Sequence, residues 1–241
     1  MTTLLKVEKI TKKFGDFYAN DQISFEVNKS EVLAILGENG AGKTTTFSMI
    51  AGFVAPTGGT LLLSDQSIVH LPPYKRARKG LVYLSQEASV FRSLTVEENI
   101  RAIAQTLRGD RKSEDEIVQQ RMEQLGIERL AAQKANTLSG GERRRLEIAR
   151  ALVLSPDFLL LDEPFSGVDP KSVSEVSEII NSLKSNGMGI LLTDHNVRET
   201  LRAVDRAYLL YEGNVLAHGS AEFLISDPDT RTKYLGVDFK A

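Results

Sequence analysis

The chain has 241 residues, of which 41% are hydrophobic and 26% charged, with a formal net charge of -2 and no cysteine. This length is enough to bury one substantial core, or a core with a small subdomain. The charge balance gives no basic surplus for nucleic acid, and the lack of cysteine excludes disulfides and thiolate metal sites from these residues. No apolar run approaches the roughly 20 residues of a membrane span, and the N-terminus lacks a signal-peptide profile. We therefore expect a soluble, cytosolic protein that acts on a membrane only through partners.

Two segments near the start alternate apolar and polar residues, as half-buried strands do. They cover residues 4–10 and 22–27 and predict an antiparallel sheet. Phe14 lies between them, and two interpretations of it stay open. Its ring either stacks on an adenine base or is buried in a turn.

A glycine-rich segment follows the apolar run at residues 32–36 and fits the pattern Gly, four residues, then Gly-Lys-Thr. Its members are Gly37, Glu38, Asn39, Gly40, Ala41, Gly42, Lys43 and Thr44. With a helical segment at 46–50 after it, the context is strand, loop, helix, which predicts backbone N–H groups that face a nucleotide's phosphates. We expect Lys43 on the β and γ oxygens, Thr44 on Mg²⁺, and Thr45 near the α-phosphate.

Further strands are predicted at residues 60–63 and 80–84, and Gln86 follows the second of them. A single Gln is usually a solvated loop residue. At the end of a strand in a phosphate-loop fold it can instead reach Mg²⁺ or the attacking water.

The middle of the chain predicts a mostly helical subdomain from about 87 to 155. A capping box at Thr95 begins a helix that continues to about 107. Residues 108–116 have mixed charge and predict a solvated connection, and 117–125 are again helical.

Ser139 is the predicted N-cap of the next helix, with Glu142 three residues later. Capping the helix is by itself a sufficient structural role for Ser139. Gly140 and Gly141 also leave bare N–H groups where an anion can approach. The arginines at 143–145 predict a solvated helix face, because acidic residues surround them.

A buried strand at 158–162 ends in two carboxylates, at the edge where open α/β sheets place their chemistry. Asp162 is placed to hold Mg²⁺ through water, and Glu163 to polarise a water against the γ-phosphate. Asp169 either caps the next helix or has a functional role. After another strand at 189–193, His195 is placed to contact the γ-phosphate.

The order of these motifs resembles the ATP-binding-cassette family over the whole chain. That resemblance implies an α/β phosphate-loop NTPase core with an N-terminal antiparallel β subdomain and an inserted α-helical subdomain. The core would comprise 1–86 and 156–241, and the helical insertion 87–155, within a single domain.

The family resemblance also implies a head-to-tail homodimer that sandwiches two ATP with Mg²⁺, each between the phosphate loop of one copy and residues 139–141 of the other. It gives Phe14 the adenine-stacking role and makes Gln86 a sensor of Mg²⁺ and the γ-phosphate. It places Asp169 in a cross-dimer contact and makes His195 a γ-phosphate switch.

Within the family, the sequence is most similar to the ATPase subunits of lipopolysaccharide export transporters. The segments that carry this resemblance are 86–92, 138–150, 193–200 and 234–239. It implies two transmembrane partner subunits, a groove at Phe91 and Arg92 that receives a helix from each, and a position on the cytoplasmic face of the inner membrane. Three alternatives remain: the ATPase of a branched-chain amino-acid importer, a soluble family member of a cytosolic assembly system, and a non-catalytic ATP-gated binding module. The presence of Lys43, Asp162, Glu163 and His195 argues against the last of these.

Overall fold

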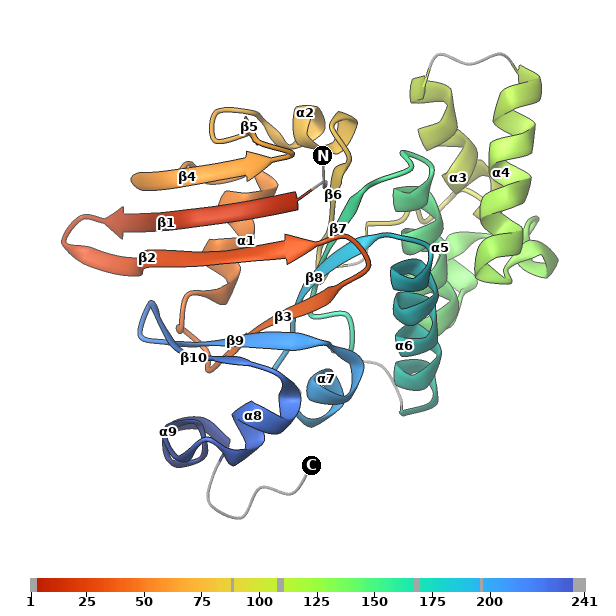
Figure 1. Ribbon diagram of the computed structural model, residues 1–241. Helices are drawn as coiled ribbons and strands as arrows, with labels where there is room; N and C mark the ends of the chain where they lie inside the picture. The colour runs from red at the N-terminus through yellow and green to blue at the C-terminus, as the bar shows by residue number, and fades with distance from the viewer. Residues whose placement is uncertain (1–3, 88, 108–110, 167–169, 196, 236–241) are drawn as a thin grey trace.

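The computed structural model describes residues 4–87, 89–107, 111–166, 170–195 and 197–235. Its strands form two sheets, and helices cover the larger one (Figure 1). The predicted α/β class, with an antiparallel sheet near the start and helices in the middle of the chain, is confirmed.

The smaller sheet is antiparallel and has the strand order β2-β1-β4-β5 in the described part of the chain. Its strands are β1 (Leu4–Phe14), β2 (Phe17–Asn28), β4 (Gly58–Leu63) and β5 (Gln66–Ser67). β1 and β2 extend past the predicted segments, because the pairing continues to Phe14 and Phe17 across a tight turn.

The larger sheet is mostly parallel, with the order β10-β9-β3-β8-β7-β6 among the described strands. These strands are β3 (Val32–Gly37), β6 (Leu81–Leu84), β7 (Phe158–Asp162), β8 (Gly189–Thr193), β9 (Arg206–Tyr211) and β10 (Asn214–Gly219). β3, β7 and β8 are buried at every position, as expected for parallel strands covered on both faces.

The alternation of side chains along the central strands divides the core into two apolar clusters. On β3, Leu33 and Ile35 pack with α1 (Lys43–Ala51) and the antiparallel sheet. Val32, Ala34 and Leu36 face the opposite side, toward the later helices. The larger sheet is therefore the middle layer of the molecule.

The remaining helices surround this layer, and α3 and α4 stand together at one end of the molecule (Figure 1). They are α2 (Pro73–Arg78), α3 (Val96–Ala104), α4 (Arg111–Leu125), α5 (Gly140–Leu152), α6 (Pro170–Ser185), α7 (Val197–Ala203), α8 (Ala221–Ser226) and α9 (Pro228–Thr230). Single 3₁₀ turns lie at Gln105–Leu107, Glu128–Leu130 and Ala135–Thr137, and a π-helical turn at Arg231–Leu235. No helix in the described residues has the length and apolar character to cross a membrane.

Two predictions in the helical region are wrong. The segment expected to be a connection is helical from residue 111, because Val118 and Met122 bury one face of α4 and Asp115 pairs with Arg101 of α3. Residues 112, 113, 115 and 116 are nevertheless exposed, as expected of a solvated segment. The expected solvated face at 143–145 is also wrong. Arg144 is buried against Glu147, with 2.9 Å between Nη1 and Oε2, and Arg145 pairs with Glu175.

A buried arginine fixes the C-terminal end of α1. Nη1 of Arg76 donates to the carbonyls of Met49 and Ile50, each at 2.6 Å, and Nε and Nη2 donate to those of Leu71 and Val69 at 2.8 and 3.0 Å. Burial lowers the pKa of Arg76 to about 10. The guanidinium satisfies carbonyls that a helix end leaves without a partner.

Replacing Arg76 by Met should therefore lower the free energy of unfolding by about 3 kcal/mol, because several buried carbonyls lose their donor. Chemical denaturation measures this. The control is Arg78→Met on the exposed side of the same helix, which should change the value by less than about 0.5 kcal/mol. Equal effects of the two substitutions would contradict the capping role.

Candidate functional site

The carboxyl ends of β3, β6, β7 and β8 meet at one edge of the larger sheet, because these strands are parallel and in register. Asp162 on β7 pairs in register with Thr193 on β8. The predicted residues that follow these strands, Gln86, Glu163 and His195, therefore come together beside the glycine-rich loop after β3.

The loop from Gly37 to Lys43 is held by its own lysine and by β2. Lys43 Nζ donates to the carbonyls of Gly37 at 2.7 Å and Glu38 at 2.9 Å. Asn20 Nδ2 donates to the carbonyl of Gly42 at 3.1 Å. Burial lowers the pKa of Lys43, and the carboxylates of Glu163 and Asp162 oppose that shift.

A cavity of about 300 Å³ opens over this loop. The residues that line it are Phe14, Phe17, Ala19, Asn39, Gly40, Gly42, Lys43, Thr44, Thr45 and Glu163. Phe14 is 53% exposed, so the interpretation as a buried turn residue is wrong. An exposed aromatic ring, a loop of backbone N–H groups and a lysine suit a planar base joined to phosphates.

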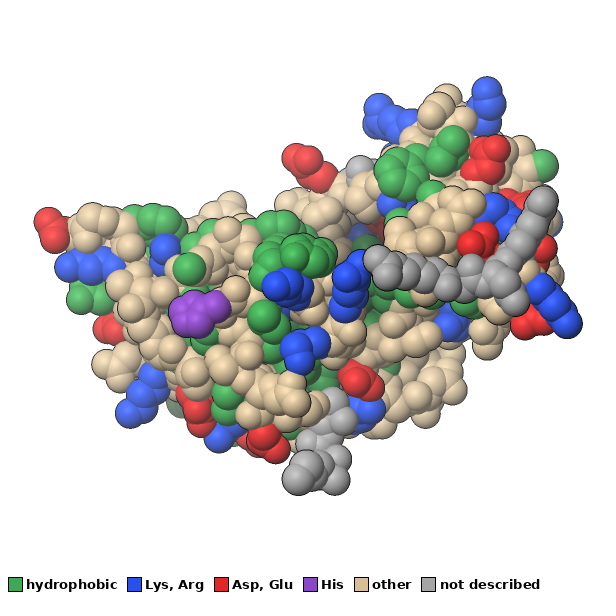
Figure 2. Space-filling view, turned by 90° about the horizontal axis from the view of Figure 1, so that it is seen from above, with side chains coloured by type: hydrophobic (Ala, Val, Ile, Leu, Met, Phe, Trp, Pro, Cys, Tyr) green, Lys and Arg blue, Asp and Glu red, His purple; other side chains and the backbone are tan. Residues whose placement is uncertain are grey.

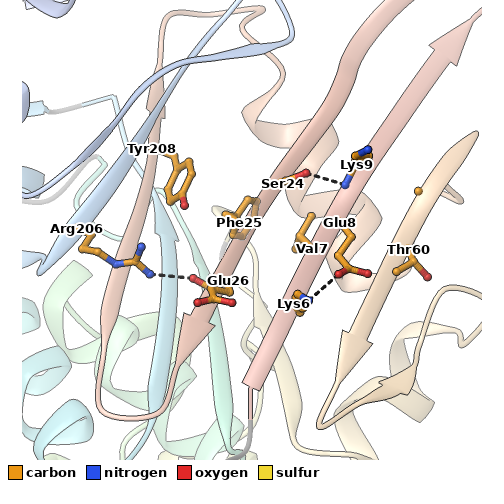
Figure 3. Close-up of a pocket in the computed structure, with 11 residues that line it drawn as sticks. Lys6, Val7, Glu8, Lys9, Ser24, Phe25, Glu26, Thr60, Arg206 and Tyr208 are labelled. Atoms are coloured by element: carbon orange, nitrogen blue, oxygen red, sulfur yellow. Dashed lines mark hydrogen bonds and ion pairs between the residues drawn. The ribbon is translucent and has the colours of Figure 1, made fainter.

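A larger cavity, of about 690 Å³, lies along the antiparallel sheet and β9 (Figure 3). Three of its charged side chains, those of Lys6, Glu8 and Arg206, have local partners. Lys6 and Glu8 pair at 2.6 Å, and Arg206 Nη2 donates to the carbonyl of Glu26 at 3.0 Å. None of the predicted site residues lines this cavity, so its size does not make it the candidate site.

Two side chains meet at the carboxylate of Glu163. Gln86 Nε2 donates to Glu163 Oε2 at 2.8 Å, and Nδ1 of His195 lies 3.1 Å from the same oxygen. Glu163 has a φ of 45°, a left-handed conformation that is costly for a residue with a Cβ. Bonds from its N–H to the carbonyl and hydroxyl oxygens of Thr193, at 2.9 and 3.2 Å, hold it there.

Asp162, at the end of β7, has a hydrogen bond to each carboxylate oxygen. Thr193 Oγ1 donates to Oδ1 at 2.6 Å, and the Tyr83 hydroxyl donates to Oδ2 at 3.0 Å. Burial first, and the charge of Asp162 second, raise the pKa of Tyr83 well above its usual value. The tyrosine therefore remains a donor.

Three predicted residues carry oxygen atoms that are candidate metal ligands. Thr44 supplies a hydroxyl, Gln86 an amide carbonyl and Asp162 a carboxylate, and such hard oxygen donors fit Mg²⁺. The described residues contain no group of three or more His, Cys, Asp or Glu side chains that could hold a metal. A cation here would share its coordination with phosphate oxygens and water, as Mg²⁺ commonly does.

The other predicted residues lie away from this cavity. Ser139 caps α5, with its hydroxyl accepting from the Glu142 N–H at 3.3 Å, so the predicted cap is confirmed. Ser139, Gly140 and Gly141 do not line the cavity over the loop. Asp169 lies outside the described residues.

The predicted groove residues precede α3. Phe91 is 45% exposed, and the Arg150 guanidinium lies 4.5 Å from the centre of its ring. Asn99 is buried and bonds to both the N–H and the carbonyl of Phe91, at 2.8 and 3.0 Å. Arg92 is also exposed.

Four supporting residues have no predicted role. Thr193 and Tyr83 hold Asp162, and Asn20 holds Gly42. Tyr234 accepts a hydrogen bond from the N–H of Gly37 at 3.1 Å, and burial raises its pKa to about 12. Thr193 ends a predicted strand, and this position could have identified it as a site residue. The other three residues could not have been identified in this way, because their roles depend on contacts between distant segments.

Comparisons with known proteins agree with this geometry. A family model described as ABC transporter matches residues 20–166. The lipopolysaccharide export system ATP-binding protein LptB of Acidithiobacillus ferridurans is 45% identical, with 100% of each chain covered. LptB of Escherichia coli strain K12 is 44% identical, with 98% of each covered. The crystal structure of the ADP conformation of an ATP-binding cassette of an ABC transporter superposes with a TM-score of 0.88 at 30% identity, covering 98% of this chain and 100% of the other.

Two glycines of the loop allow a matched test of its packing. Gly42 has a φ of 102°, and a Cβ there would lie 2.6 Å from the Ala19 carbonyl oxygen and 2.5 Å from Asn20 Nδ2. Gly40 has a φ of 84°, but a Cβ there would meet no atom within 4 Å. Denaturant unfolding should show a loss of about 3 kcal/mol for Gly42→Ala and about 1 kcal/mol for Gly40→Ala, since only the first adds a collision to backbone strain.

Equal losses in the two variants would show that Gly42 does not pack against β2 as described.

Proposed function

The chain belongs to the ABC transporter family, and on that basis we propose that it is the ATP-hydrolysing subunit of a lipopolysaccharide export transporter. The observation that carries the ATPase assignment is the convergence of Gln86 and His195 on Glu163, at the edge of the phosphate-loop cavity. The names and full-length coverage of the LptB relatives support the cargo.

ATP would bind with its base on Phe14 and its phosphates on the loop. Lys43 already has its ammonium group at the loop's carbonyls, 2.7 and 2.9 Å away, so it reaches the β and γ oxygens without refolding of the loop. Thr45 lines the same cavity, where its hydroxyl can meet the α-phosphate. The backbone N–H groups and the N-terminus of α1 supply the remaining positive potential.

Thr44, Gln86 and Asp162 would hold Mg²⁺. When bound, the ion would neutralise part of the charge on the β and γ phosphates. Asp162 suits this task because hydrogen bonds to both of its oxygens fix its orientation, while each oxygen has lone pairs left.

Glu163 would act as the general base that polarises the attacking water. The bond from Gln86 orients its carboxylate, and the bond that its own N–H donates to Thr193 holds its backbone. His195 is 56% exposed and reaches the same oxygen, so it can exchange Glu163 for a γ-phosphate oxygen when ATP is bound. Proton transfer to a positioned carboxylate lowers the barrier to attack on phosphorus.

Two copies would form the complete ATP site. Ser139, Gly140 and Gly141 start α5 but line no part of this chain's own phosphate cavity, which supports a role toward the nucleotide of a second copy. A Cβ at Gly140 would have no atom within 4 Å, so its backbone is open to an approaching phosphate. We propose Asp169 as a further contact across this dimer.

The membrane subunits would dock at Phe91 and Arg92, on the cytoplasmic face of the inner membrane. The face that borders α2 and α3 shows hydrophobic side chains beside Lys and Arg around a hollow (Figure 2). Exposed aromatic rings on nearby segments include Phe53, Tyr74 and Phe91. Closure of the ATP dimer would bring two such surfaces together, and we assign the segment 87–155 to the moving helical subdomain.

Replacing Glu163 by Gln should lower the rate of ATP hydrolysis by roughly 100- to 10,000-fold, because the amide cannot accept the proton of water. ATP should remain bound, and size-exclusion chromatography with ATP should show a stable dimer. Phosphate release measures the rate. The control is Glu178→Gln, an exposed acid on α6, which should hydrolyse ATP normally.

Normal turnover in the Glu163→Gln protein would refute the assignment of the general base.

Phe91→Ala should abolish recovery of the membrane subunits while leaving ATP binding unchanged, since the ring lies outside the phosphate cavity. The measurement is purification of the tagged chain from detergent-solubilised membranes, with mass-spectrometric identification of what accompanies it. The unmutated chain should bring two membrane subunits with periplasmic domains.

The matched control is Phe223→Ala, a similarly exposed phenylalanine on α8, which should keep those partners. Recovery of amino-acid permease subunits or of soluble proteins alone would contradict the lipopolysaccharide assignment and leave the ATPase assignment intact.

A further inference from the structure

Tyr83 connects the end of α1 to the carboxylate that the proposed function assigns to Mg²⁺. It lies on β6, three residues before Gln86, and its hydroxyl donates to Asp162 Oδ2 at 3.0 Å. Its ring packs edge-on against Phe53, with ring centres 5.4 Å apart and planes at 69°. Phe53 follows the C-terminal cap of α1, whose N-terminal end carries Lys43 and Thr44.

We propose that Tyr83 is a positioning residue for Asp162, and that the Phe53 ring sets the position of Tyr83. The inference rests on the proposed Mg²⁺ site and adds two residues to it. Neither touches the cavity over the phosphate loop, so they act through Asp162 alone.

The two hydrogen-bond donors to Asp162 are held in place in different ways. Thr193 lies on β8, is buried, and bonds to Oδ1 at 2.6 Å from a strand that pairs in register with β7. Tyr83 reaches Oδ2 by a long side chain from β6. The ring of Tyr83 is only partly buried, so its position depends on what packs against it.

Phe53 supplies that packing from the surface. The Phe53 side chain is 60% exposed, and its backbone N–H bonds to the Ser48 carbonyl of α1 at 2.9 Å. Edge-to-face aromatic pairs have a preferred geometry, so Phe53 restricts the tilt of the Tyr83 ring. Because the ring carries the hydroxyl group, restricting the tilt of the ring also restricts the position of the hydroxyl. The hydroxyl in turn fixes the orientation of the Asp162 carboxylate.

Orientation of a metal-binding carboxylate affects metal affinity directly. Residues that hydrogen-bond to metal ligands typically contribute 10- to 100-fold to affinity or activity. Without the Tyr83 hydroxyl, Asp162 keeps only the hydrogen bond from Thr193. Its carboxylate can then rotate about that remaining bond. The affinity for the metal should fall, whereas the contacts of Lys43 and the loop with nucleotide should not change.

The test uses Mn²⁺, which takes oxygen sites like those of Mg²⁺ and gives an electron paramagnetic resonance signal when free. Mn²⁺ is titrated into the full chain with a non-hydrolysable ATP analogue. Tyr83→Phe, which keeps the ring, should raise the Kd for Mn²⁺ about tenfold. Phe53→Ala should raise it about threefold. Both should bind the analogue normally without metal.

The matched control is Tyr74→Phe, because Tyr74 is an exposed tyrosine on α2 that lies outside the cavity. It should leave the Kd unchanged. Thr193→Val removes the other donor to Asp162 and should weaken Mn²⁺ binding as Tyr83→Phe does.

An unchanged Kd for Mn²⁺ in Tyr83→Phe would overturn the inference, as would an equal loss of analogue binding without metal. Failure of the unmutated chain to bind the analogue would instead refute the proposed ATPase function. Analogue binding that does not strengthen Mn²⁺ binding in the unmutated chain would refute the metal site and the inference with it.

Discussion

The register of the parallel strands is the constraint on which the site depends. β7 pairs with β8 from Phe158 to Asp162, so Asp162 and Thr193 lie opposite each other where the strands end. β6 also pairs with β7 in parallel register, and this pairing brings Tyr83 and Gln86 to the same edge of the sheet. Since successive side chains point to opposite faces, a slip of one residue would turn Asp162 toward the other face of the sheet. β3, β7 and β8 are buried at every position, so no apolar–polar alternation fixes their register, and specific contacts such as the hydrogen bond from Thr193 to Asp162 accompany it instead.

Helix α1 connects the phosphate loop to the rest of the core, and its two ends are held differently. At the N-terminal end, Asn20 bonds to the Gly42 carbonyl and to the Thr46 hydroxyl, at 3.1 and 3.0 Å. At the C-terminal end, Arg76 fills the role of a cap for Met49 and Ile50. The helix is too short to be stable alone, so these contacts and burial between the two sheets determine its position. Because the loop leads directly into α1, the position of the helix also determines the position of the loop.

Local sequence was sufficient to predict the central parallel strands, the two capping boxes and the sheet edge at which the candidate site lies. Each depends on residues within about one turn or one strand, as at Thr95 and Ser139. The wrong predictions came from side chains whose partners are distant. Arg145 was expected in solvent because its neighbours are charged, but it pairs with Glu175 on α6. The residues that hold Asp162 and Gly42 depend on the sheet register, which periodicity alone does not provide.

Thr193 makes the two carboxylates of the site interdependent. Its hydroxyl donates to Asp162 Oδ1 and accepts from the Glu163 N–H, at 2.6 and 3.2 Å. The backbone of Glu163 is in a conformation that costs roughly 1 to 3 kcal/mol and needs such support. A shift of Asp162 toward a cation would therefore move Thr193, and through it the backbone of Glu163, the residue that we propose as the general base. In the proposed mechanism, metal binding and water activation would in this way be connected by one hydroxyl group, which lies on the strand that also leads to His195.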